Sequence, residues 1–195
     1  MDVLSPKTLD EARALLPALA EASRTVGSPQ IRNRGTVGGN LGTASPAGDA
    51  IPPLLIEDAE VEIASVRGER RVPLGDFVVG VKWNVLEPDE LVLSVRVQPS
   101  RARQTFMKVG PRNAMVISVC SLALEVDRER GEVRAAFGSA APVPTLIAAP
   151  LDAVDSFPDA VVAAASPIDD VRGTADYRRH ALEVLARRSL ERCLA

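Results

Sequence analysis

Residues 30–55 read Gln30-Ile-Arg-Asn-Arg-Gly-Thr-Val-Gly-Gly-Asn-Leu-Gly-Thr-Ala-Ser-Pro-Ala-Gly-Asp-Ala-Ile-Pro-Pro-Leu-Leu55, and the interpretation of the remaining sequence depends on them. Glycine and proline interrupt this stretch too often for an ordinary helix or a plain strand. Gly38 and Gly39 are adjacent, so the backbone there is free to adopt positive φ and to approach a ligand closely. Successive N–H groups in such a loop form a cradle suited to phosphate. A Gly-Gly pair is, however, more often a simple tight turn, and the spacing is not that of G-x-G-x-x-G.

Polar side chains lie along the same loop, and Asp49 ends it. The carboxylate of Asp49 could accept a hydrogen bond from a ribose hydroxyl, or it could cap the helix predicted for residues 50–56. The basic residues Arg32 and Arg34 either order the loop or meet phosphate. Spacing alone leaves nucleotide binding open, and the stretch has to be judged as a whole.

Taken as a whole, residues 31–40 followed by residues 43–49 closely resemble the FAD-binding (medium) subunit of molybdenum-containing hydroxylases, the family of xanthine dehydrogenase and carbon monoxide dehydrogenase. Residues 167–179 resemble the signature of that family's C-terminal domain. The resemblance implies an α+β fold. Residues 1–99 would form the second half of a PCMH or CO-dehydrogenase-type FAD-binding domain. Residues 103–195 would form a CO dehydrogenase flavoprotein C-terminal-like domain, a three-stranded antiparallel sheet with helices.

Composition narrows the function classes. The chain has 195 residues and a formal net charge of −3, which gives no electrostatic case for nucleic acid. No apolar run is long enough to span a bilayer, and residues 1–6 do not have the pattern of a signal peptide. We therefore expect a cytoplasmic protein. Cys120 and Cys193 lack ligand spacing and are too few for a [2Fe–2S] centre, so both are expected to be buried apolar residues.

The first part of the chain predicts helices and then strands. Residues 8–11 fit a capping box, and Pro17 divides the helical pattern into two pieces. Alternation predicts strands at residues 59–66 and 91–97, the second with Leu91, Leu93, Val95 and Val97 on its apolar face. A boundary is expected near residues 99–103.

The second part predicts three antiparallel strands followed by helices. The strands are expected at residues 104–109, 115–126 and 132–137. Helices are expected at residues 146–154, 158–165 and 174–194, the last with a clear apolar stripe.

The resemblance also implies that part of the usual FAD site is missing. Residues 3–12 resemble the opening of full-length family members, and residues 16–22 resemble the helix just before the Gly-Gly loop. In the family, a subdomain with a second glycine-rich loop, which grips the FAD pyrophosphate, lies between these two places. Either the two ends are joined directly here, or the chain starts late and the first similarity is fortuitous. In both cases we expect the chain alone to bind FAD weakly.

Carried over position by position, the resemblance assigns FAD contacts to Thr36, Val37, Gly38, Gly39, Asn40, Gly48, Asp49, Val92 and Lys108. Residues 36–40 would face the phosphates, Gly48 and Asp49 the adenosine side, and Val92 and Lys108 the isoalloxazine. A cation at Lys108 would favour the anionic reduced flavin. Lys108 could equally be a solvated strand lysine and Val92 a simple core residue.

In this family, electrons leave the substrate at a molybdenum–pterin centre and pass through iron–sulfur clusters to FAD, which delivers them to NAD or another acceptor. The resemblance therefore implies an iron–sulfur small subunit and a molybdenum–pterin large subunit as partners, with both metal cofactors on those chains. No residue here suggests a substrate-transforming acid, base or nucleophile. The alternative is a shortened family member that serves as a structural or assembly piece.

Overall fold

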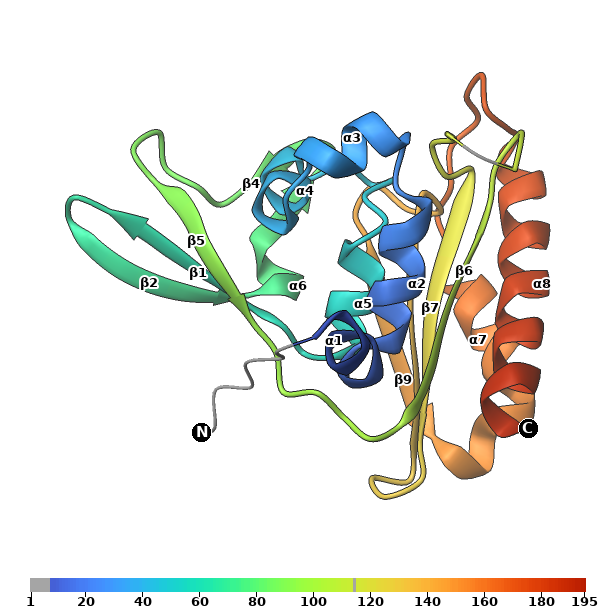
Figure 1. The fold of residues 1–195 in the computed structure, drawn as a ribbon. Coiled ribbons are helices and arrows are strands. Elements are labelled where there is room, and N and C mark those ends of the chain that lie inside the picture. The colour runs from blue at the N-terminus through green and yellow to red at the C-terminus, as the bar shows by residue number, and fades with distance from the viewer. Residues whose placement is uncertain (1–7, 114) are drawn as a thin grey trace.

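The computed structural model describes residues 8–113 and 115–195. Figure 1 shows a small sheet at one end of the molecule and a larger sheet at the other, with short helices between them. Further helices cover the outer face of the larger sheet. The α+β class expected from the sequence is confirmed.

Five short helices open the chain: α1 (Leu9–Leu15), α2 (Pro17–Thr25), α3 (Pro29–Arg34), α4 (Val37–Thr43) and α5 (Ile51–Ile56). The Thr8 hydroxyl accepts a hydrogen bond from the N–H of Glu11, as the capping box predicted. Pro17 stands at the start of α2, where its missing N–H costs nothing. The part of residues 3–12 that precedes residue 8 lies outside the described residues.

The Gly38-Gly39 pair lies inside helix α4, so the prediction of an irregular loop there was wrong, although residues 44–50 connect α4 to α5 without helix. Thr36 caps α4 by accepting a hydrogen bond from the N–H of Gly39 at 2.9 Å, and Ser28 caps α3 in the same way. Neither Gly38 nor Gly39 has positive φ. A side-chain cap stabilises the start of each short helix, and in α4 it offsets part of the roughly 1 kcal/mol that each glycine costs. Gly38 and Gly39 therefore provide room, not an unusual backbone turn.

The smaller sheet has the order β2-β1-β5, with β1 (Glu60–Ser65), β2 (Gly68–Pro73) and β5 (Leu91–Arg96) all antiparallel. The short elements α6 (Leu74–Phe77), β3 (Val78–Gly80) and β4 (Trp83–Asn84) connect its strands. The strand at β5 is confirmed, but its predicted apolar face is not. A bulge lets Ile63 pair with Val92 while Glu62 pairs with Ser94, so the alternation shifts by one residue. Leu91 and Leu93 are consequently exposed.

The larger sheet has the order β6-β7-β8-β9, with β6 (Arg103–Val109), β7 (Cys120–Asp127), β8 (Glu132–Gly138) and β9 (Thr145–Pro150). Two predictions need correction. In the described chain a fourth strand, β9, replaces most of the helix expected at residues 146–154, because the free edge of β8 pairs with it. The strand expected from residue 115 begins only at Cys120. The 3-10 helix η1 (Leu151–Ser156) follows β9.

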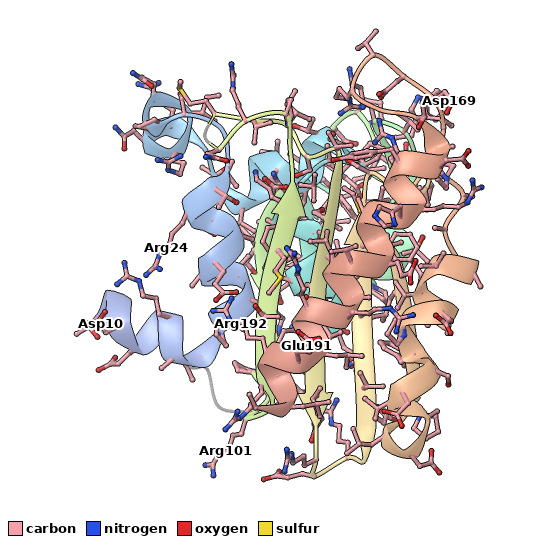
Figure 2. The ribbon with its side chains drawn as sticks, turned by 90° about the vertical axis from the view of Figure 1, so that its right-hand side faces the viewer. Asp10, Arg24, Arg101, Asp169, Glu191 and Arg192 are labelled. Atoms are coloured by element: carbon pink, nitrogen blue, oxygen red, sulfur yellow. The ribbon has the colours of Figure 1, made fainter. Side chains whose placement is uncertain are left out.

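Two helices, α7 (Phe157–Ala163) and α8 (Ala175–Leu194), complete the chain and confirm the helices expected there. Figure 2 shows α8 lying across the larger sheet. Its stripe of Leu182, Leu185, Ala186 and Leu190 is buried in one core cluster with β7 and β8. A second cluster joins α2, α5 and the smaller sheet to Phe106, Ala123 and Ala136 on the opposite face of the larger sheet. The division into domains near residues 99–103 stays a prediction.

Candidate functional site

The capped helix α4 packs against β5 beside a groove of about 520 Å³. Gly38 faces Val92 of β5, and a Cβ atom placed on Gly38 would lie 3.5 Å from the Val92 side chain, in ordinary van der Waals contact. Thr36, Val37, Gly38 and Val92 all line this groove. The structure thus brings together four of the predicted FAD contacts. Leu16, Leu19 and Leu54 make the remaining wall largely apolar.

Asn40 and Gly48 meet on the other side of α4. A Cβ atom on Gly48 would lie only 3.1 Å from Asn40 Oδ1 and 3.1 Å from the Ser45 carbonyl oxygen, so a larger residue at 48 would crowd both. Asn40 Oδ1 is buried and has no hydrogen-bond partner within the described part of the chain. Buried polar atoms are normally satisfied, so this oxygen is an exception among the polar groups around α4. Asn40 and Asp49 both line a second cavity of about 360 Å³.

Asp49 and Lys108 form a buried ion pair, with Nζ 2.6 Å from Oδ2 and side chains 6% and 8% exposed, respectively. Lys108 also donates to the carbonyl oxygens of Thr25 at 2.8 Å and Val116 at 3.3 Å. The Ser118 hydroxyl donates to the other Asp49 oxygen at 2.5 Å. Asp49 therefore does not cap α5, whose start has no side-chain cap.

The structure therefore places in direct contact two residues that the resemblance assigns to the adenosine side and to the isoalloxazine, and their contacts with FAD stay a prediction. Lys108 is also not a solvated strand lysine. Sequence reasoning missed Ser118, which is one of two serines in a largely apolar run and was not distinguished from Ser121 by any local signal.

Next to Lys108 lies a cavity of about 690 Å³ whose wall includes Arg24, Arg32 and Arg112. Arg32 donates to the carbonyl oxygens of Val26 and Gly27, at 3.0 and 3.1 Å, so in this structure it orders the turn between α2 and α3. The predicted contacts are thus divided among a groove on one side of α4 and two adjoining cavities on the other.

Comparison with known proteins identifies the family. Residues 4–99 match the family model described as the FAD binding domain in molybdopterin dehydrogenase. The chain is 32% identical over 196 residues to the xanthine dehydrogenase FAD-binding subunit of Escherichia coli O157:H7, covering 92% of this chain and 67% of that one. The chain belongs to the family of FAD-binding subunits of molybdenum hydroxylases.

Other members of the family agree in sequence and in fold. The carbon monoxide dehydrogenase medium chain of Hydrogenophaga pseudoflava is 28% identical, with 91% of this chain and 67% of that one covered. The structure of reconstituted CO dehydrogenase from Oligotropha carboxidovorans superposes with a TM-score of 0.85 at 26% identity, covering 94% of this chain and 69% of that chain. The chain thus spans about two thirds of the length of these relatives.

The two cysteines of this FAD-subunit family member are buried, as the sequence predicted. Burial raises the pKa of Cys120 to about 12 and that of Cys193 to about 11. Both thiols therefore stay protonated at neutral pH and act as apolar core residues. Over residues 8–113 and 115–195, no helix is long and apolar enough to cross a membrane.

Proposed function

We propose that the chain is the FAD-binding, electron-transferring subunit of a heteromeric molybdenum hydroxylase in the cytoplasm. It would accept electrons from iron–sulfur clusters on a small partner chain, which receive them from molybdenum–pterin on a large partner chain. The final acceptor would be NAD or another oxidant. A flavin supplies the redox chemistry in such a relay, while the protein supplies its orientation and electrostatic environment.

The packing of α4 on β5 carries this proposal. The absence of a side chain at Gly38 leaves the groove open where it meets Val92. The apolar wall, which includes Leu16, Leu19 and Leu54, would take the flat face of an aromatic ligand. Lys108 is held by Asp49 and places a cation at the wall of the adjoining cavity.

A flavin titration with two matched glycine variants tests this placement. Gly38→Leu puts a side chain against Val92 in the groove, whereas Gly42→Leu adds one to the same helix where a Cβ atom meets nothing within 4 Å. We expect saturable quenching of FAD fluorescence by the wild-type chain and by Gly42→Leu. Gly38→Leu should bind at least about tenfold more weakly, a difference of about 1.4 kcal/mol. Circular dichroism checks that both variants are folded.

Other outcomes separate the proposal from its alternative. Equal weakening by both variants would place the flavin elsewhere. If the folded wild-type chain shows no saturable binding at any FAD concentration tested, the electron-transfer function is overturned for this chain, and a structural or assembly role remains.

A further inference from the structure

Three large apolar side chains are exposed around the cavity of about 360 Å³. Ile31 of α3, Met115 and Ile117 are 55%, 53% and 63% exposed, and all three line this cavity. Figure 1 shows α3 and the connection from β6 to β7 near the same end of the molecule. Single exposed apolar residues are ordinary in proteins, but several around one hollow form a patch of the kind that marks an interaction site.

Arginine side chains surround this patch. Arg112 lines the same cavity, and it also lines the adjoining cavity of about 690 Å³ together with Arg24 and Arg32. All three arginines are exposed. Figure 2 shows Arg24 projecting from α2 away from α8. We call the following six residues the basic face: Arg24, Ile31, Arg32, Arg112, Met115 and Ile117.

The basic face is built from parts of the sequence that contain no acidic residue. The chain has 26 Asp and Glu residues and a formal net charge of −3, yet none of these acidic residues lies in residues 22–48 or 91–124. Among the described residues that line the two cavities, the only carboxylate is that of Asp49, which is paired with Lys108. Arg32 donates to two carbonyl oxygens, which hold its guanidinium in place without cancelling the charge. Positive charge therefore gathers here in a chain that is negative as a whole.

An apolar centre with an arginine rim has the composition of a protein–protein interface. Met and Arg are enriched in such interfaces, whereas Lys, Glu and Asp are depleted. A small anion would use the arginines, but it would leave the three apolar side chains in water. The surface that complements the basic face is therefore an apolar patch on another protein, surrounded by carboxylates.

The basic face lies across α4 from the groove in which we place the flavin. Asn40 of α4 lines the cavity beside the basic face, whereas Val37 and Gly38 of the same helix line the groove. A helix with its side chains is about 10–12 Å across. A redox protein seated on the basic face would therefore be separated from the groove by about one helix diameter, which keeps the path for electrons short.

We propose that the basic face docks an acidic surface of the iron–sulfur chain that delivers electrons to the flavin. This inference rests on the proposed function, from which the identity of the electron donor is taken. The arginines steer the acidic partner during the encounter, and the burial of Ile31, Met115 and Ile117 then slows its dissociation.

Affinity capture from the native host isolates the partner. The tagged full chain is incubated with host lysate at low salt, and the bound protein is assayed for iron and acid-labile sulfide. We expect an iron–sulfur protein that is released as the salt concentration rises, because the Debye length falls from about 30 Å at 0.01 M to about 10 Å at 0.1 M. A folded chain that captures no iron–sulfur protein overturns the proposal, and so does capture of proteins without iron and sulfide alone.

Two pairs of substitutions then locate the contact with the purified iron–sulfur chain. Arg24→Glu reverses a charge of the basic face, and Arg188→Glu makes the same change at an exposed position of α8, on the other side of the larger sheet. Ile117→Glu places a charge in the apolar centre, and Val66→Glu does so at the 97% exposed turn between β1 and β2. Calorimetric titration should give a Kd at least about tenfold higher for Arg24→Glu and Ile117→Glu, and within about twofold of the wild type for both controls.

The remaining outcomes are equally decisive. Equal effects of each substitution and its control, or no effect of Arg24→Glu and Ile117→Glu, overturn docking at the basic face. If these two substitutions weaken FAD binding but leave the affinity for the iron–sulfur chain unchanged, the face is a small-anion site and the proposal is overturned. A chain that binds no FAD but binds the iron–sulfur chain through the basic face supports the docking, while the electron-transfer function fails.

Discussion

Among single side chains, Asp49 and Lys108 form a buried ion pair that joins β6 to the segment just before α5. The resemblance selected both residues, but it could not show that they bind each other, because they are 59 positions apart in the chain. Only the fold brings β6 to the start of α5. The sequence could equally not show that Asn40 Oδ1 is buried without a hydrogen-bond partner among the described residues, since its burial depends on Gly48 lying against it.

Removing the charge of Asp49 should destabilise the protein strongly. In Asp49→Asn, the Lys108 ammonium keeps two carbonyl partners but loses its buried counter-ion. An uncompensated buried charge costs about 3–5 kcal/mol. Urea unfolding followed by circular dichroism measures the loss.

Asp10→Asn is the control. Asp10 forms an ion pair with Arg13 at the surface, where the Asp10 side chain is 91% exposed. Exposed pairs contribute about 0–1 kcal/mol. Equal effects of the two substitutions would contradict the view that Asp49 compensates a buried cation.

For the helices and strands, the sequence was most informative where a local signal acted alone. The Thr8 cap, the break at Pro17 and the long stripe of α8 all depend on neighbours within a few positions, and all three were predicted. The strand β9 and the bulge in β5 were not. Both are set by a partner strand, β8 in one case and β1 in the other, so local alternation could not reveal them.

The end of β8 meets the loop that follows α4, and Gly138 permits this approach. A Cβ atom there would lie 2.8 Å from the Pro46 carbonyl oxygen and 2.8 Å from the Ser121 hydroxyl. The N–H of Ser139 donates to the same carbonyl, so the backbone cannot move away without losing that hydrogen bond. Gly138→Ala should therefore cost about 1–3 kcal/mol of stability.

Gly42→Ala should have the opposite effect on stability to Gly138→Ala. This glycine is within α4, and a Cβ atom would meet nothing within 4 Å among the described residues, so alanine should stabilise the protein by about 0.5–1 kcal/mol. Thermal unfolding measures both variants: the unfolding midpoint should fall for Gly138→Ala and rise for Gly42→Ala. A neutral Gly138→Ala variant would show that the loop after α4 is not held against β8.

For the whole molecule, the sequence separated the strands of the two sheets correctly but could not show how the two halves pack. Helices α2 and α5 belong to the first half, yet they bury their apolar side chains against the second sheet. Glu21 of α2 accepts a hydrogen bond from the N–H of Phe106 at 2.7 Å and pairs with Arg192 of α8 at 2.5 Å. These contacts join elements from opposite ends of the chain.

The shared core predicts that the two halves unfold together. Phe106 in β6 and Ile63 in β1 belong to one buried cluster, so opening either sheet exposes the other's apolar surface. In hydrogen exchange across a urea series, amides of β1 and β7 should lose protection at the same denaturant concentration. Phe106→Ala should lower both midpoints together, with a cost of about 3–5 kcal/mol. If β1 instead exchanged at low urea while β7 stayed protected, the chain would consist of two independently stable domains divided near residues 99–103, and the core between them would contribute little to either.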